Sequence, residues 1–228
     1  MCFSAEADIV TGLAVTAVGI DTMRHVGHHR EATLAVLPVI FGIHQLIEVP
    51  VWMGFEGGVS VEAAHTATRL YLLIAFGLIP WIVPLAVRLL EVDASRRRIM
   101  ESMVGLGVVV SIALTIPVLV SPVSAMEAPG HAAYSAELVW GGPLAMLYVI
   151  VTCGALLASS DRVVRIYGGV NLVAVATLTV LLTTGVVSLW CVWAAVTSIA
   201  IAVHLRNLHH RHERAVTKAV PPTATGWW

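Results

Sequence analysis

The feature that most constrains the fold of this chain is a succession of long apolar stretches separated by short polar ones. Hydrophobic residues make up 58% of its 228 positions and charged residues 12%, which leaves too few polar side chains to cover a soluble domain. A helix needs about 20 apolar residues to cross a bilayer. Runs of that kind lie at 5–23, 32–55, 66–90, 101–121, 142–159, 166–184 and 186–204.

These runs predict an all-α fold, a polytopic membrane bundle of seven transmembrane helices. The last two runs together are too long to cross as one helix, so the chain is expected to turn back at Thr183–Gly185. No linker separates two hydrophobic cores. The sequence therefore predicts a single seven-helix domain over residues 1–207 and a cytoplasmic tail over 208–228.

The basic residues predict the orientation of this bundle. If seven helices alternate in direction, nearly all arginines fall on one side of the membrane, and Arg69 is the exception near the other side. Because basic residues accumulate on the cytoplasmic side, the N-terminus is expected outside and the C-terminus inside the plasma membrane. The basic residues of the predicted inner side are Arg24, Arg30, Arg96, Arg97, Arg98, Arg162, Arg165, Arg206, Arg211, Arg214 and Lys218.

One carboxylic acid lies in the middle of an apolar run. Glu48 falls within 32–55, where a charged side chain at the bilayer centre costs roughly 2.5 to 3.5 kcal/mol on insertion scales. His44, Gln45 and Glu48 share one helical stripe with the aromatic residues Phe41 and Trp52. This stripe is expected to face protein or a cavity, either as a polar knot that holds helices together or as a functional site.

Two further charged residues are candidates to act with Glu48. Arg69 lies near the same predicted depth. If the two side chains pair, Glu48 stays ionised; if they do not, the apolar surroundings favour a neutral acid able to deliver a proton. Asp8 shares a helix face with Gly12 and Gly19, whose small size lets another helix pack closely, so Asp8 is expected to point inward.

Several aromatic residues are candidates for the wall of such a site. Tyr71, Trp140, Trp190 and Trp193 lie in or next to the predicted helices. Tryptophan and tyrosine also gather at membrane interfaces without any catalytic function. Considered with Phe41 and Trp52, however, they provide ring faces that stabilise cations through the ring quadrupole.

Other classes of function lack support in the sequence. The three cysteines are far apart and form no CxxC pair, and no histidine cluster has the frame of a zinc site, so neither a metal nor a cofactor is predicted. The only lysine, Lys218, lies in the tail, which excludes a retinal Schiff base within a helix. The expected partners are the lipid bilayer and a lipophilic small molecule, with no nucleic acid.

Three segments carry a resemblance to known proteins: the opening MCFSAEAD of residues 1–8, the stretch Gly19–Val26 and the stretch His44–Glu48. They resemble a family of small actinobacterial membrane proteins with seven spans. The general outline is also similar to the bacterial membrane-bound terpene cyclases of the drimentine type, which close a prenyl chain attached to an indole. These enzymes need no aspartate-rich DDxxD motif, and none occurs here.

The resemblance and the residues together favour an acid-initiated terpene cyclase. In this hypothesis Glu48 or Asp8 protonates a terminal alkene or epoxide of a prenylated substrate, such as a farnesylated indole. His44, Gln45 and Arg69 set the proton state of the acid. The aromatic residues named above line the pocket.

Two alternatives belong to other classes. A metal-dependent membrane hydrolase would use His44, His65 and His131 with a carboxylate. A transporter or binding protein would use Glu48 and Arg69 as a gating or proton-coupling pair.

Overall fold

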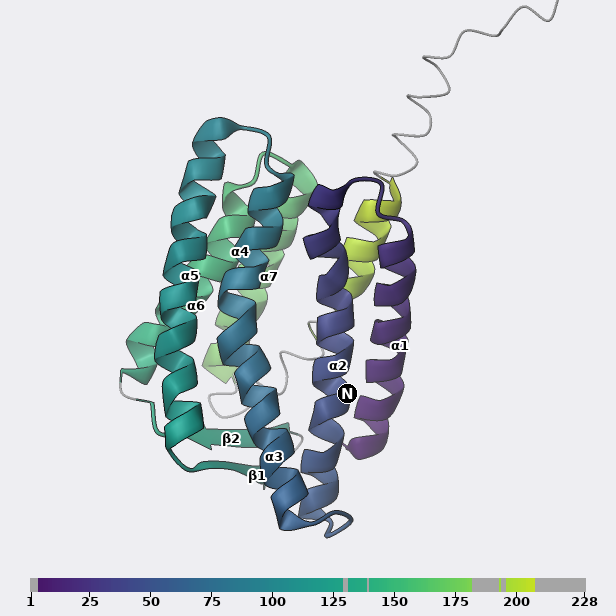
Figure 1. Ribbon diagram of the computed structural model, residues 1–228, viewed down its shortest axis with the longest axis vertical. Coiled ribbons are helices and arrows are strands. Elements are labelled where there is room, and N and C mark those ends of the chain that lie inside the picture. The colour runs from purple at the N-terminus through teal and green to yellow at the C-terminus, as the bar shows by residue number, and fades with distance from the viewer. Residues whose placement is uncertain (1–3, 129–130, 139, 182–192, 194–195, 208–228) are drawn as a thin grey trace, which may run out of the picture.

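The computed structural model shows a bundle of long helices that run side by side, with a β-hairpin across one end (Figure 1). It describes residues 4–128, 131–138, 140–181, 193 and 196–207. The elements are α1 (Ala5–Arg24), η1 (His29–Glu31), α2 (Ala32–Phe55), α3 (Val61–Leu72), η2 (Leu73–Leu78), α4 (Ile79–Leu90), α5 (Ala94–Val120), β1 (Val123–Ala128), β2 (His131–Ala136), α6 (Gly141–Ala158), α7 (Arg162–Leu181) and a final helical stretch over 196–207.

Four of these helices are long and apolar enough to cross a membrane, namely His29–Phe55, Val61–Leu90, Ala94–Val120 and Gly141–Ala158. The prediction of a helical membrane protein is confirmed in this form. The expected boundaries 32–55 agree with α2, whereas the helices predicted to begin at 66 and 101 begin earlier. The reason is capping, because Ser60 and Asp93 accept hydrogen bonds from the first-turn amides of α3 and α5.

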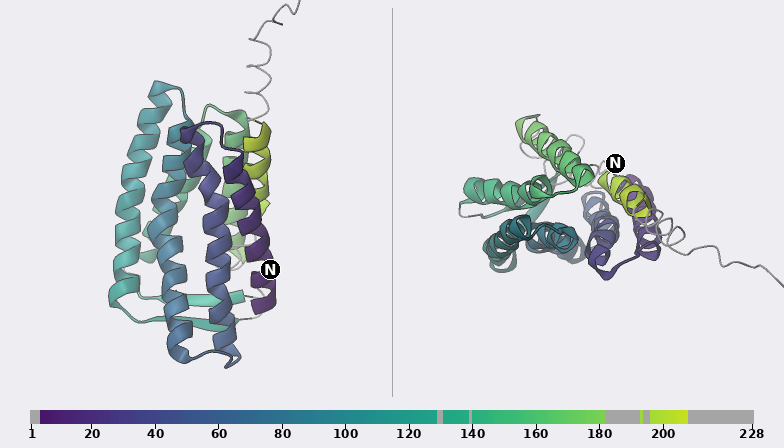
Figure 2. Two further views of the ribbon diagram at one scale, coloured as in Figure 1. Left: turned by 45° about the vertical axis from the view of Figure 1, so that its right-hand side comes forward. Right: turned by 90° about the horizontal axis from the view of Figure 1, so that it is seen from above.

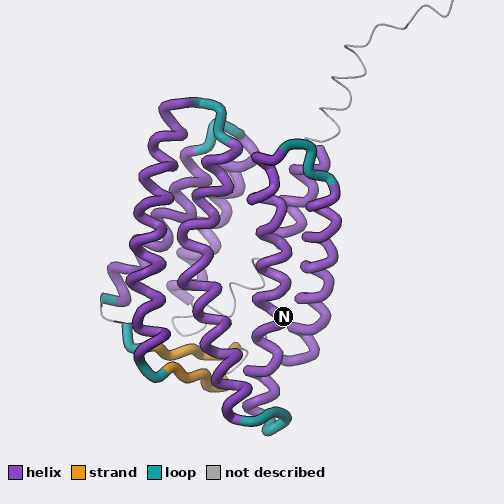
Figure 3. The backbone as a smooth tube through the Cα atoms, in the orientation of Figure 1, coloured by secondary structure: helices purple, strands orange, loops and turns teal. Residues whose placement is uncertain are grey.

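The bundle has two ends of different character, which we name here. The hairpin end carries the link 56–60 and the residues from 121 to 140; the basic end carries the links 25–28, 91–93 and 159–161. In the tube view the hairpin is the only strand structure drawn, and it spans the width of the bundle (Figure 3).

The β-hairpin is a departure from the predicted all-α fold, which treated residues 122–142 as a loop. β1 pairs antiparallel with β2, from Val123 opposite Ala136 to Ala128 opposite His131. The strands consist largely of small residues and carry no periodic apolar pattern that would have predicted them. Val123 and Ala132 are buried against the helices below, so the pairing is stabilised by packing on the bundle.

Helices α1 and α2 pack backbone to backbone through glycines. A β-carbon on Gly19 would lie 2.6 Å from the Val39 amide nitrogen, and one on Gly42 would lie 2.8 Å from the Gly12 carbonyl oxygen. The expectation that the glycine face of α1 allows close helix packing is therefore confirmed.

A π-helical segment joins α3 to α4 within one continuous helix. η2 precedes Pro80, which has no amide hydrogen to donate to the preceding turn. Carbonyls in and next to this segment accept hydrogen bonds from side chains. His44 Nε2 donates to Tyr71 O, Tyr148 OH to Ala75 O, and Trp81 Nε1 to Gly77 O.

The final stretch 196–207 lies beside α1 and α2 in the view from above (Figure 2). Trp193 Nε1 donates to Asn171 Oδ1, and four residues further along, Thr197 bonds with Tyr167, four residues back on α7. This register shows that α7 and the final stretch run antiparallel. The predicted turn at 183–185 and the predicted tail over 208–228 lie outside the described residues.

Candidate functional site

The polar stripe of α2 is buried at the hairpin end, as the sequence predicted. Glu48 has no exposed surface, Gln45 is 1% exposed and His44 is 7% exposed. Pro50 lies two residues after Glu48 and adds to the irregularity of the helix there. The stripe thus faces the other helices and the hairpin, and not lipid.

The hairpin supplies a direct partner for the acid. Tyr134 of β2 donates its phenolic hydrogen to Glu48 Oε1, with an O–O distance of 2.8 Å. Sequence reasoning missed Tyr134, because a lone tyrosine among alanines and a serine in an expected loop has no periodic pattern to mark it. Only the folding of the hairpin over the bundle brings it to α2.

Three rings form a stack beside this hydrogen bond. The Tyr71 ring lies between the His44 ring, at a centroid distance of 3.9 Å, and the Tyr134 ring, at 4.6 Å. His44 Nε2 is 3.0 Å from the Tyr71 carbonyl oxygen. A carbonyl only accepts, so His44 Nε2 must carry hydrogen, and this bond holds the ring against Tyr71.

Asp8 reaches the same level of the bundle from α1. It is fully buried, and it lies one turn before Gly12, which packs on Gly42 and Leu46. Because α1 and α2 are antiparallel, one turn from Gly12 towards the hairpin end places Asp8 opposite the turn of α2 that holds Glu48. The inward orientation that the sequence predicted for Asp8 is confirmed.

Trp52 forms the part of the wall nearest the hairpin. Its ring packs with Ala5, Ala132 and Tyr134, and it meets Phe55 edge to face at a centroid distance of 5.6 Å. The side chain is 4% exposed, and its indole N–H has no hydrogen-bond acceptor among the described residues. A buried donor of this kind is costly to leave unsatisfied, so it favours a ligand with an acceptor or a π-face at this place.

Arg69, which was predicted to act on Glu48, lies apart from it. Its side chain is exposed on α3, and none of the ion pairs between described residues joins it to Glu48. The alternative of a clamped Glu48–Arg69 pair is thus not what these residues form. The electrostatic partner of the acid is a phenol and not a guanidinium.

The predicted aromatic residues separate into three groups. Tyr71 and Trp52 belong to the cluster around Glu48. Trp140 does not, because it is 73% exposed at the start of α6, with a left-handed backbone φ of 66°. Phe41 and Trp193 line a crevice nearer the basic end, and Trp190 lies outside the described residues.

The histidines of the hydrolase alternative are also placed separately. His65 is exposed on the first turns of α3, and His131 is buried where β2 begins. Among the residues that the structure describes, no group of three or more histidine, cysteine or acidic side chains is arranged to hold a metal ion.

Charged residues at the basic end are arranged differently. The recorded ion pairs of the described chain all lie there, and they include Arg206–Asp21 and Arg88–Glu101. Glu91 is 2% exposed and accepts from the amides of Val92 and Asp93 and from the amide and hydroxyl of Ser160. Burial by itself would raise the pKa of Glu91, but these hydrogen bonds outweigh it and lower the pKa below its ordinary value.

Comparison with known proteins gives one match. Residues 1–217 fit the model of a family of unknown function, DUF6629. Neither the curated proteins nor the solved structures contain a match to this chain.

Proposed function

From the premise that this chain belongs to DUF6629, a family of unknown function, we propose that it is an integral membrane terpene cyclase that starts its reaction with a proton from Glu48. The observation that carries the proposal is the setting of this carboxyl group. It is fully buried and accepts from a neutral phenol, and no arginine among the described residues pairs with it.

Such surroundings favour a neutral acid. In a medium of low dielectric, a carboxylate without a cation is costly, and protonation removes the charge. Tyr134 OH donates to one oxygen, which leaves the acidic hydrogen on the other oxygen, Oε2, for transfer to a substrate.

The chemistry requires no redox partner. The Glu48 proton adds to the terminal alkene of a prenyl chain and gives a tertiary carbocation, and the remaining double bonds then attack in turn to close rings. Loss of a proton from the last cation restores an alkene, so the product is an isomer of the substrate. With an epoxide substrate, the proton opens the epoxide and becomes part of an alcohol.

The rings around Glu48 suit the cationic intermediates. Tyr71 and Tyr134 are stacked, and Trp52 lies next to Tyr134. Their faces attract positive charge, and the hydrocarbon surroundings exclude the water that would quench a carbocation. His44 and Gln45 hold positions on the same stripe, from which they orient the acid and its neighbours.

The proposal includes the finer topology that the sequence predicts. The chain crosses the plasma membrane seven times, with its N-terminus outside and the basic end in the cytoplasm. The hairpin end, and Glu48 with it, then lies in the outer half of the bilayer, where a lipophilic substrate enters from the membrane.

The test uses purified protein in lipid nanodiscs, farnesylated indole as substrate and D₂O as solvent. We expect a cyclic isomer that carries one deuterium on carbon, which identifies initiation by protonation. Glu48→Gln is expected to lower turnover by at least about 100-fold, the range of a general acid. Substitution at Asp8 (Asp8→Asn) in parallel separates the two carboxyl candidates.

The matched control is Glu56→Gln, which makes the same change at an exposed glutamate one residue beyond α2. It should leave turnover within twofold. Turnover retained by Glu48→Gln, or cyclisation without deuterium on carbon, would contradict the proposal. Binding of the substrate by wild-type protein without any product would favour the transporter or binding-protein alternative.

A further inference from the structure

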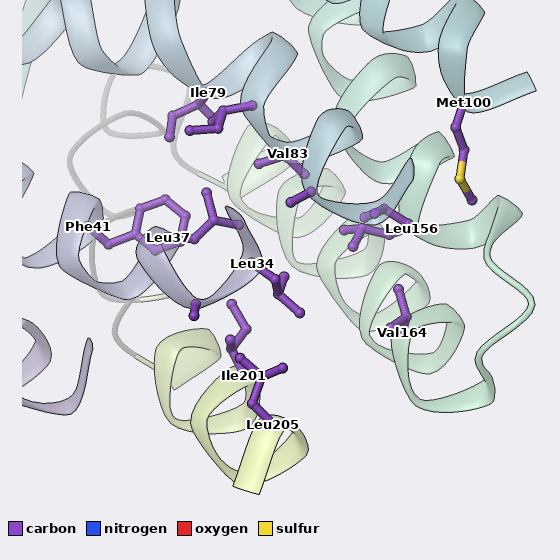
Figure 4. Close-up of a cluster of buried hydrophobic side chains, with 14 of the residues drawn as sticks. Leu34, Leu37, Phe41, Ile79, Val83, Met100, Leu156, Val164, Ile201 and Leu205 are labelled. Atoms are coloured by element: carbon purple, nitrogen blue, oxygen red, sulfur yellow. The ribbon is translucent and has the colours of Figure 1, made fainter. Parts of the chain in front are cut away.

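A narrow crevice lies on the basic-end side of the Glu48 cluster, between α2 on one side and α4, α6 and α7 on the other. Its empty space, counted out to its open side, is about 510 Å³. Figure 4 shows Leu34, Leu37 and Phe41 on one wall and Ile79 and Val83 on the other. The walls near the hairpin end and near the basic end are both hydrocarbon.

The crevice and the acid lie on the same stripe of α2. Leu34, Leu37 and Phe41 are followed by His44 and Glu48 at steps of three or four residues, so all five share one face. Leu34 and Glu48 are roughly 20 Å apart along the helix axis. The stripe is apolar along the crevice and becomes polar at the hairpin end.

Polar side chains of the crevice wall hydrogen-bond to other protein groups. Trp193 Nε1 donates to Asn171 Oδ1, and Thr197 bonds with Tyr167. Thr152 Oγ1 donates to the Tyr148 carbonyl oxygen at 2.8 Å. The wall therefore presents mainly carbon to an occupant, which favours a hydrocarbon chain over a polar ligand.

The two walls are held together loosely. Helix α2 packs far more extensively on α1, through the glycine contacts, than it does on α4. A chain that enters the crevice therefore separates α2 from α4 without breaking the α1–α2 packing, and the apolar contact it makes replaces what is lost.

We propose that this crevice binds the apolar chain of a linear isoprenoid whose head lies beside Glu48. The position of the head rests on the proposed function, while the binding of the chain does not. A chain held in this way is aligned along the bundle axis, and the crevice length then selects the length of the prenyl group.

The experiment measures photolabelling in the Glu48→Gln background, where turnover is not expected. The probe is a farnesol analogue with a diazirine at the tail end of its chain, added to protein in nanodiscs. We expect labelled peptides from α4 and α6, which contain Val83 and Leu156. Val83→Phe fills the crevice and should weaken labelling by about 10-fold, the cost of excluding one or two buried carbons.

The matched control is Val109→Phe, the same change at a position of α5 that is 61% exposed. It should leave labelling unchanged. Val83→Ala enlarges the crevice and should increase labelling by the longer geranylgeraniol analogue relative to the farnesol analogue. This second variant decides the question if Val83→Phe does not fold.

Labelling confined to other helices, or a chain-length preference that neither Val83 variant alters, would overturn the crevice assignment. If wild-type protein cyclises the substrate and the Val83 variants have no effect, the crevice assignment fails and the cyclase stands. If the probe labels the crevice and no substrate is converted, the cyclase fails and the chain-binding site stands.

Discussion

Glu48 and Glu91 are both buried glutamates, and the difference between them shows how the same side chain serves two purposes. Glu91 lies in the link between α4 and α5 and accepts hydrogen bonds from three backbone amides and a serine hydroxyl. Glu48 lies within α2 and accepts from the phenol of Tyr134. Several donors stabilise the ionised form of Glu91, whereas the phenol and the apolar surroundings of Glu48 are compatible with a neutral acid.

The two ends of the bundle differ in the same way. At the basic end, arginines pair with acids and also bond to carbonyls, as Arg96 does with Ala158 O at 2.8 Å, and these contacts fasten neighbouring links together. At the hairpin end, the buried acids Asp8 and Glu48 lie among aromatic rings. The comparison teaches that charge at the basic end stabilises the fold, while the hairpin end is built for chemistry.

The strongest way to break this comparison is to make the same substitution at both glutamates. Glu48→Gln should abolish turnover, by at least about 100-fold, and change the free energy of unfolding by less than about 1 kcal/mol. Glu91→Gln should do the reverse, with a loss of stability on the order of 2 kcal/mol and normal turnover per folded molecule. Thermal unfolding and turnover are measured on both variants; equal behaviour of the two would refute the distinction.

Packing between α1 and α2 determines whether Asp8 and Glu48 share a site. Gly42→Ala places a methyl group 2.6 Å from the Thr16 amide nitrogen, and overpacking of this kind costs about 1–3 kcal/mol. Both a lower melting temperature and lower turnover are expected. Gly105→Ala is the control, because a β-carbon there meets nothing within 4 Å; a loss of stability as large as that of Gly42→Ala would contradict the packing argument.

The pH dependence of stability sharpens the account of Glu91. Its pKa is lower in the folded protein than its ordinary value of 4.5, so the unfolded chain takes up a proton at higher pH than the folded chain does. The stabilisation is therefore complete above the ordinary pKa and is lost as the pH falls through the folded pKa. The melting-temperature difference between wild-type protein and Glu91→Gln should narrow as the pH is lowered from about 6 to about 3.5. A gap that stays constant or widens would show that the carboxylate form is not what stabilises the link.

The smallest effect is expected at Arg69. Its side chain is exposed and outside the recorded ion pairs, so Arg69→Gln should alter turnover by less than about threefold, within the range of a screened surface charge. Arg88→Gln, which breaks a 2.7 Å ion pair with Glu101, is the companion variant and should affect stability more. Loss of turnover in Arg69→Gln would revive the gating-pair alternative.

Much of the site was predictable because the helical period is encoded locally. The stripe that joins His44, Gln45 and Glu48 follows from residue spacing alone, and burial of the stripe follows from the cost of charge in hydrocarbon. The inward face of Asp8 followed from Gly12 and Gly19, since glycines allow helices to approach.

What the sequence by itself determined is therefore the set of apolar helices, the faces that they bury and the presence of an acid within one of them. Only the tertiary structure decided that acid's partners: it brought Tyr134 to Glu48 across 86 positions of sequence and left Arg69 exposed. The physical reason is that helix periodicity and hydrophobic burial act over neighbouring residues, whereas the hairpin is held in place by packing on helices distant in sequence. No local pattern in 122–142 records that contact, so its position emerges only when the bundle has formed.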